Sequence, residues 1–318
     1  MKIFRFKPIL KQTIWGGDKI AKLKHLTPQL DGIGESWELS GLKGCETVCL
    51  DGSGRSLNDM VACYGERLVG KNVYERFGNV FPILVKFIDA KKDLSVQVHP
   101  DEDMALKNNL QNGKTEMWYA LPSSHDALLY CGLRHPVTHC QFRQMVQDGT
   151  LCDILASYHV AEGDVFFVPA GRIHAIGAGC LLVEIQQTCD ITYRIYDYGR
   201  KNKDGEQRQL HLQEALEAID LSVKTDYRTY YDSRKNQPCE LVSCPYFVTS
   251  VYDITKTVRI NHKQLDSFVI LIGLSGEIVV STIGHATILH SFETILIPAE
   301  NREVKLDGVG KVLEVHCP

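Results

Sequence analysis

The sequence predicts a mainly β protein of the sandwich or jelly-roll kind, with a few peripheral helices. From Ile83 onward, short apolar or alternating segments recur between Gly, Asn and Asp residues, which is typical of antiparallel strands. The clearest predicted strands are ILVKFIDA, SVQVH, MWYALP, DVFFVPA and LLVEIQQT. Helical periodicity is confined to Leu57 to Val69, Asp101 to Leu110, Pro136 to Leu155 and Leu212 to Ile219. These helices do not alternate regularly with strands, so a doubly wound α/β fold is disfavoured.

The chain is predicted to contain two domains joined by a connector. A polar, Tyr-rich segment runs from Lys224 to Cys239, and strand patterns resume after it. We therefore expect residues 1–235 to form one domain, with helical decorations, and residues 236–318 a second, smaller β domain.

The second domain resembles part of the first. When Pro169 is set against Pro298, GDVFFVPAGRIHAIGAGCLLVEI lies over FETILIPAENREVKLDGVGKVLEV with the same strand, turn and strand spacing. Glu303 then stands where the first copy has His174. We expect the second copy to be degenerate and to serve structure.

The composition excludes several classes of protein. Lys and Arg number 35 against 39 Asp and Glu, without a basic block, so neither nucleic acid nor an anionic membrane is an expected partner. The chain has no apolar run of about 20 residues and its start lacks the features of a signal peptide, so a cytoplasmic location is expected. Eleven cysteines without a C-x-x-C pair indicate reduced thiols. Glycine-rich nucleotide motifs are also missing.

Four side chains from three segments predict a metal site. Gln97 and His99 are two residues apart on a predicted strand, so both face the same side. Glu116 begins the next strand, and His174 follows a Pro-x-Gly turn. Two imidazoles, one carboxylate and one amide oxygen suit Zn²⁺ with an open coordination position, which is typical of a catalytic site.

The same residues carry a resemblance to a known family. The cupin motif Gly-x5-Pro-x-Gly-x2-His is matched by Gly163, Pro169, Gly171 and His174. Gln97 replaces the first His of the other cupin motif, and this substitution resembles the type I phosphomannose isomerases. The strings GKTEMWY, GRIHAIG and EIQQTCDITYRIYDYGR are similar to that family as well.

The resemblance extends from Trp15 to Arg200 and continues more weakly to the C-terminus. It implies two cupin-type jelly-roll barrels in the short bacterial form of the family, without the large helical domain of the longer enzymes. It also implies interconversion of mannose 6-phosphate and fructose 6-phosphate with one Zn²⁺ per chain. The ligands that it implies are Gln97, His99, Glu116 and His174.

Four further positions match residues that act on or line the substrate in this family. An Arg ten residues after a strand Glu is implicated in catalysis, and Glu184 and Arg194 have that spacing. Ser95 and Lys114 match positions that line the substrate. The resemblance therefore implies that Arg194 is catalytic and that Ser95 and Lys114 line the substrate. Together with the residue types, we expect Arg194, Glu184 and Lys114 to be catalytic, and Ser95, Lys114 and Arg194 to bind the substrate.

The residue types suggest how the reaction would proceed. Moving a carbonyl between adjacent carbons requires a base that shuttles one proton through an enediol(ate), and Glu184 on an apolar strand is the first candidate. Arg194 could donate to the enediolate or to the phosphate, and Lys114 could bind phosphate or relay a proton. The structural alternatives are an ion pair between Glu184 and an arginine, and a solvated turn lysine at position 114.

Some features leave other functions open. This chain has Lys114-Thr115-Glu116 where the long form has Lys-Pro-Glu, and Arg194-Ile195-Tyr196 where it has Arg-Ala-Gly, so the phosphate contacts stay undetermined. One alternative is another sugar-modifying cupin enzyme, such as an iron dioxygenase or a nucleotide-sugar epimerase. A second alternative is a non-catalytic sugar-phosphate sensor. The expected assembly is a monomer or a homodimer.

Overall fold

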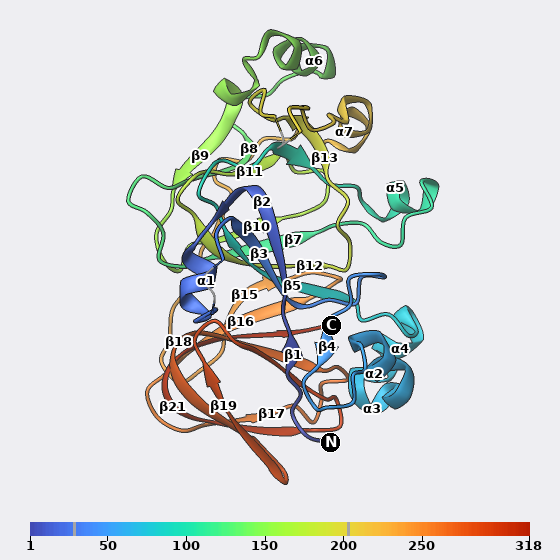
Figure 1. Cartoon of the computed structure of the whole chain (residues 1–318), viewed down its shortest axis with the longest axis vertical. Coiled ribbons are helices and arrows are strands. Elements are labelled where there is room, and N and C mark those ends of the chain that lie inside the picture. The colour runs from blue at the N-terminus through green and yellow to red at the C-terminus, as the bar shows by residue number, and fades with distance from the viewer. Residues whose placement is uncertain (28–29, 202–203) are drawn as a thin grey trace. The chain divides into compact units, whose positions relative to one another are not determined.

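The computed structural model describes residues 1–27, 30–201 and 204–318, and the protein is mainly β, as predicted (Figure 1). The chain forms two compact units. The first, which we call the central unit, consists of Leu10–Ser36 and Phe87–Thr229. The other, called the terminal unit because it holds both chain ends, consists of Met1–Ile9, Trp37–Lys86 and Tyr230–Pro318.

The central unit contains strands of two sheets. A seven-stranded sheet has the order β14-β10-β7-β12-β5-β3-β2, and a five-stranded sheet has the order β13-β6-β11-β8-β9. The strands of the first sheet are β2 (Ile9–Gly17), β3 (Ile33–Leu39), β5 (Ile83–Asp89), β7 (Glu116–Ala120), β10 (Val165–Val168), β12 (Leu181–Gln187) and β14 (Arg228–Thr229). Those of the second are β6 (Val96–Val98), β8 (Leu128–Leu133), β9 (Leu155–His159), β11 (His174–Ile176) and β13 (Tyr193–Tyr196).

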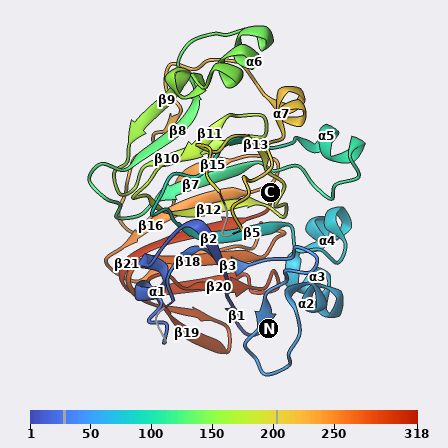
Figure 2. The ribbon, with the colours of Figure 1, turned by 45° about the horizontal axis from the view of Figure 1, so that its top comes forward.

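Apolar layers cover both faces of the five-stranded sheet. On one face, Leu129 and Ile176 pack with Trp118 and Phe166 of the other sheet in a shared core. The opposite face packs against helices α6 (His139–Asp148) and α7 (Leu212–Ala218), with Phe142 completely buried. Figures 1 and 2 show both helices beside this sheet. Strands β8 and β11 therefore contribute side chains to both apolar layers, whereas β6 and β13 contribute only to the helix-covered one.

The predicted helices form, but local signals move their ends. Helix α6 begins at His139 because Thr138 and Gln141 form a capping box, and it ends before Gly149, which is left-handed at φ 71°. A short 3₁₀ helix, Leu151–Ile154, completes the segment predicted from Pro136 to Leu155. The remaining helices of the central unit are α1 (Lys19–Leu23), which was not predicted, and α5 (Glu102–Lys107).

The terminal unit is a seven-stranded antiparallel sheet with added N-terminal segments. Its main order is β15-β16-β21-β18-β19, with β17 paired to β21 and β20 to β18. The strands are β15 (Cys239–Ser243), β16 (Val248–Ile254), β17 (Val258–Asn261), β18 (Val269–Thr282), β19 (His285–His290), β20 (Thr294–Ile297) and β21 (Glu303–His316). The smaller elements are β1 (Phe6–Lys7), β4 (Val48–Cys49), α2 (Leu57–Tyr64), α3 (Glu66–Val69) and α4 (Lys71–Phe77). Gly65, at φ 50°, separates α2 from α3, so the helical segment predicted from Leu57 to Val69 forms two helices.

Residues from the beginning of the chain complete the terminal unit. The backbone N–H of Phe4 donates to the carbonyl of Leu296 at 2.9 Å, and the reverse bond, from Leu296 to Phe4, has the same length. The predicted division at residues 235 and 236 lies near the junction at Thr229 and Tyr230, but it did not anticipate that residues 1–9 and 37–86 join the C-terminal strands. The assignment of catalysis to one domain and structure to the other stays a prediction.

The strand orders are open paths, and the described residues show no closed barrel. The structure therefore supports the prediction of a mainly β protein, but it does not show two closed barrels. All eleven cysteines lie in the described part of the chain and are free thiols, as expected. Among the described helices, none is long and apolar enough to cross a membrane.

Candidate metal centre

The register of three neighbouring strands brings predicted site residues to one side of the five-stranded sheet. His174 of β11 is paired with Gln97 of β6, and Gln97 is paired on its other side with Arg194 of β13. Their strand neighbours Val96, Val98 and Tyr193 belong to the helix-covered layer. Side chains alternate along a strand, so Gln97, His174 and Arg194 face the other sheet.

A tight turn places His174 at the start of its strand. The N–H of Arg172 donates to the carbonyl of Pro169 at 3.1 Å, and Gly171 has a φ of 82°, as a type II turn requires. A β-carbon on Gly171 would lie 2.8 Å from the carbonyl oxygen of Ala218. The N–H of Gly171 also donates to the carbonyl of His99 at 3.0 Å, so the turn connects the two histidine segments.

Both histidines present an unprotonated nitrogen to the same space. The Nδ1 atom of His99 lies 2.9 Å from the carbonyl of Ile191, and that of His174 lies 2.8 Å from the carbonyl of Arg172. A carbonyl can only accept, so each Nδ1 carries the proton and each Nε2 keeps a lone pair. Backbone carbonyls orient metal-binding imidazoles in this way.

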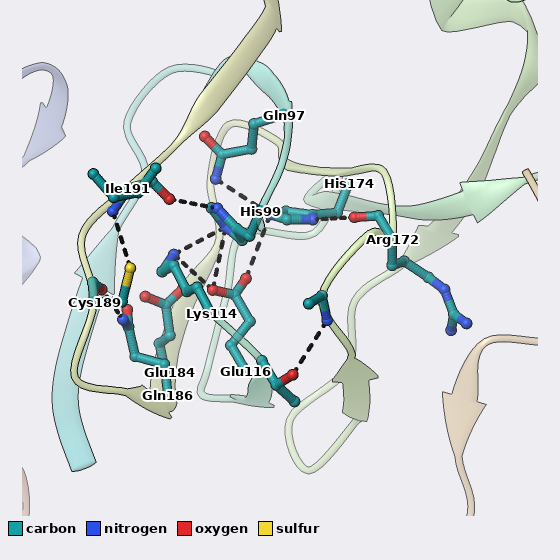
Figure 3. A network of polar contacts seen from close by, with 12 residues as sticks. Gln97, His99, Lys114, Glu116, Arg172, His174, Glu184, Gln186, Cys189 and Ile191 are labelled. Atoms are coloured by element: carbon teal, nitrogen blue, oxygen red, sulfur yellow. Dashed lines mark hydrogen bonds and ion pairs between the residues drawn. The ribbon is translucent and has the colours of Figure 1, made fainter. Parts of the chain in front are cut away.

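The Glu116 carboxylate lies between these two lone pairs (Figure 3). Its Oε2 is 3.4 Å from Nε2 of His99, and its Oε1 is 3.4 Å from Nε2 of His174. The three side chains are almost fully buried and offer ligand atoms that all lie within 4.8 Å of one another. Tetrahedral zinc ligands lie roughly 3.4 Å apart, given Zn–N and Zn–O distances of about 2.0–2.2 Å. The donor set therefore fits a zinc ion.

Burial and nearby charges hold these groups in their ligand forms. Desolvation, and then the charge of Lys114, lower the pKa of His99 to about 3, so its imidazole is neutral at working pH. Desolvation also lowers the pKa of His174. For Glu116, burial raises the pKa, but the charge of Lys114 and the contacts with both histidines outweigh it, so this pKa is well below the ordinary value.

Lys114 is part of the cluster and not a solvated turn residue. Its ammonium is 2.7 Å from Oε2 of Glu116 and 2.9 Å from Nε2 of His99, and its side chain is 4% exposed. The alternative of a solvated lysine at this position is therefore wrong. The ammonium supplies a positive charge beside the carboxylate.

Gln97 contacts the cluster through its amide nitrogen. Its Nε2 lies 3.2 Å from Nε2 of His174, while its Oε1 accepts from the hydroxyl of Ser95 at 3.3 Å. The structure thus brings Ser95 and Gln97 to the cluster. Ligation by the amide oxygen requires the amide to be turned by half a rotation about its last torsion, which exchanges two atoms of nearly equal size.

Glu184, the predicted base, and Arg194 lie on opposite sheets and face the cluster of His99, Glu116 and His174. Glu184 of β12 is paired with Trp118 of β7, and the Oε2 atom of Glu184 accepts from the indole N–H of Trp118 at 3.0 Å. Gln186 is paired with Glu116, so Glu184 and Glu116 point to the same side of their sheet. Arg194 donates to the carbonyl of Gln209 at 2.9 Å, and its buried Nε has no hydrogen-bond partner among the described residues.

A cationic cluster beside Arg194 was not predicted. Asp197 accepts from the guanidinium groups of both Arg200 and Arg208, with Arg208 Nε at 2.7 Å from Oδ2. Burial lowers the pKa of Arg194, and the nearby charge of Arg208 adds to this. Three guanidinium groups and one carboxylate leave two net positive charges. No local pattern marks Arg208 as a site residue, because residues 197 and 208 meet only in the folded chain.

Two sheets that enclose a His, Glu and His cluster define a metal-binding protein of the cupin class. Comparison with known families is consistent with this class. A family model described as phosphomannose isomerase type I, catalytic domain, matches residues 3–145. A second model, described as mannose-6-phosphate isomerase, cupin domain, matches residues 237–317.

Relatives match over nearly the whole chain. Mannose-6-phosphate isomerase ManA of Bacillus subtilis is 31% identical, with 98% of each chain covered. Mannose-6-phosphate isomerase of Streptococcus mutans is 30% identical, with 96% of each chain covered. A crystal structure of the mannose 6-phosphate isomerase from Bacillus subtilis superposes with a TM-score of 0.89 at 26% identity, and covers 99% of this chain and all of that one.

The chain belongs to the type I phosphomannose isomerase family. The prediction of the family and of an isomerase is confirmed. Neither another kind of cupin enzyme nor a sensor is found among the relatives named above.

Proposed function

We propose that this protein interconverts mannose 6-phosphate and fructose 6-phosphate with one bound zinc ion per chain. The observation that carries the proposal is the convergence of two neutral imidazole nitrogens on one buried carboxylate, in a chain of this family. Zinc would be held by Gln97, His99, Glu116 and His174. When bound, it would supply Lewis-acid stabilisation of negative charge on the sugar oxygens.

Glu184 is our candidate for the base that moves the proton. Its carboxylate would take the C2 proton of the open-chain aldose, while the C1 carbonyl oxygen gains a proton, which gives an enediol. Return of a proton to C1 and loss of the hydroxyl proton at O2 would then give the ketose. The Trp118 indole, which donates to Oε2 at 3.0 Å, fixes the direction of this carboxylate.

Two cationic groups would stabilise the charge that develops during the transfer. Lys114, held between His99 and Glu116, can donate to a sugar oxygen or relay a proton. Arg194 faces the same space from β13, and its Nε, which has no partner within residues 1–27, 30–201 and 204–318, can donate to the enediolate or to the substrate. Ser95 lies next to Gln97 and can contact the substrate too.

The phosphate would bind at the cationic cluster. A phosphomonoester carries about two negative charges at neutral pH, which matches the excess of Arg194, Arg200 and Arg208 over Asp197. Planar guanidinium groups suit phosphate oxygens because they donate two parallel hydrogen bonds. This assignment places the phosphate on the β13 side of the metal centre.

The activity can be tested directly. Purified protein is expected to contain about one zinc per chain and to convert mannose 6-phosphate in a coupled assay for fructose 6-phosphate. A chelator should abolish turnover, and added zinc should restore it, because the developing charge then loses and regains its metal. A zinc-loaded protein without turnover would contradict the proposed function, as would full turnover after complete zinc removal.

Replacement of Arg208 with glutamine tests the phosphate site. We expect KM for mannose 6-phosphate to rise on the order of tenfold or more, because a hydrogen bond to a charged group contributes about 1.5–3 kcal/mol. Zinc content should stay unchanged, and inhibition by inorganic phosphate should weaken in parallel. Arg134, an exposed arginine of the same unit, provides the control as Arg134→Gln. Equal KM values for the two variants would place the phosphate elsewhere.

The proposal extends to the domains, the location and the assembly of the protein. Each unit would be a jelly roll of the cupin type, with catalysis in residues 1–235 and a structural role for the degenerate domain, residues 236–318. We also propose a cytoplasmic location, and a sugar phosphate as the small-molecule partner. The protein would act as a monomer or a homodimer.

A further inference from the structure

Arg172 and Tyr227 form a contact beneath the predicted metal ligand His174. The Arg172 guanidinium stacks on the Tyr227 ring, with 4.8 Å between Cζ and the ring centroid. Both side chains are buried, with exposed fractions of 6% and 4%. In Figure 3 the Arg172 side chain is directed away from the cluster, whereas its carbonyl faces His174. Arg172 therefore contacts the metal ligand only through its backbone.

Tyr227 is a rigid support for this stack. Its hydroxyl accepts from the N–H groups of Leu133 at 3.2 Å and Lys224 at 3.0 Å, and donates to the carbonyl of Leu133 at 3.1 Å. Its ring lies directly on Gly132, where a β-carbon would come within 2.1 Å of the tyrosine Cζ. Four polar and steric constraints thus fix the ring on strand β8, the neighbour of β11.

The Arg172 backbone is the acceptor that sets the tautomer of His174. Its carbonyl accepts a hydrogen bond from the protonated Nδ1 of His174 at 2.8 Å, which leaves Nε2 as the ligand atom. The turn before it is held by the bond from Arg172 to Pro169, and Asp220 donates its N–H to the carbonyl of Gly171 at 2.8 Å. Since side chain and backbone belong to one residue, the stack limits rotation of this carbonyl away from His174.

A buried guanidinium at this position calls for a reason beyond filling space. Burial of a charged group costs free energy, and an apolar side chain of similar length would fill the same volume without that cost. Stacking of the planar guanidinium on the ring holds the Arg172 side chain in one orientation. An apolar side chain, which rotates freely, would not be held in this way.

We propose that Arg172 and Tyr227 are positioning residues, which hold the Arg172 carbonyl against Nδ1 of His174 and so raise the affinity of the centre for zinc. This inference rests on the proposed function, because it takes His174 to be a metal ligand. It assigns neither residue a contact with the metal or with the substrate.

The test measures the zinc dissociation constant by competition with a chromophoric chelator on the full chain. Loss of groups that orient metal ligands weakens affinity about 10–100-fold, and we expect Arg172→Met to fall in this range. The matched control is Arg228→Met, because Arg228 stacks on Tyr158 at 4.9 Å in the same unit but bonds to the carbonyl of His159. Its zinc affinity should stay that of the wild type. Visible spectra of the cobalt-substituted proteins should change for Arg172→Met alone.

Two further variants keep the test decisive. Arg172→Lys keeps a cation over the ring and should recover part of the affinity, while Tyr227→Phe keeps the stack without its hydroxyl anchors and should lose less affinity than Arg172→Met. Wild-type affinity in Arg172→Met, with a lowered melting temperature like that of Arg228→Met, would reduce the stack to a structural role. If Arg172→Met does not fold, wild-type affinity in Tyr227→Phe overturns the proposal. A wild-type chain that binds no zinc would instead contradict the proposed function.

Discussion

Replacement of Glu116 with glutamine should remove zinc from the protein and lower turnover by about a thousandfold or more. Lewis-acid stabilisation contributes several kcal/mol, and about 4 kcal/mol corresponds to a factor of a thousand in rate. The amide keeps the size of the side chain but cannot balance the charge of the metal or of Lys114, whose ammonium lies 2.7 Å from the carboxylate. Metal analysis and the coupled assay measure the two effects.

Arg194→Ala is the control for this prediction. Arg194 faces the same space but is not among the four predicted ligands, so this variant should keep about one zinc per chain while it loses rate. Full zinc content in both variants would mean that the assigned ligand set is wrong. Stability should be measured as well, because loss of one partner of a buried ion pair costs about 3–5 kcal/mol.

Replacement of Glu184 with glutamine should lower kcat by about 10²–10⁴-fold and leave zinc content and KM nearly unchanged. The amide can still accept from the Trp118 indole, so the geometry is kept while the basic group is lost. Exchange of deuterium from C2 of labelled mannose 6-phosphate should slow by the same factor, because this exchange reports the proton transfer itself.

An exposed carboxylate of the same unit provides the control for that change. Glu162→Gln alters the charge equally but lies on the surface, and its kinetics should match the wild type. If Glu184→Gln isomerises at the wild-type rate, another group moves the proton, and Lys114 becomes the first candidate.

The sequence alone was informative where function depends on local pattern. The two-residue spacing of Gln97 and His99 and the Pro-x-Gly turn before His174 predicted segments that the fold does bring together. Helix α6 also followed its capping signal at Thr138. These features are encoded within a few residues of one another, so propensity and spacing are sufficient to find them.

Features that depend on distant contacts could not be predicted. The burial of Lys114 results from packing against His99 and Glu116, and its neighbours in the sequence suggested a solvated turn as readily. Asp197 meets Arg208 across a loop, and Arg172 reaches Tyr227 across 55 positions of the chain. The joining of residues 1–9 to the C-terminal strands has the same origin.

The two apolar layers around β8 and β11 have a consequence for the strand that carries His174. A strand packed on both sides cannot shift or tilt unless it opens one of those layers, at a cost in lost dispersion contacts. The position of His174 is thus preorganised by the protein interior. Zinc would enter a space already shaped for it, with little entropy spent on ordering the chain.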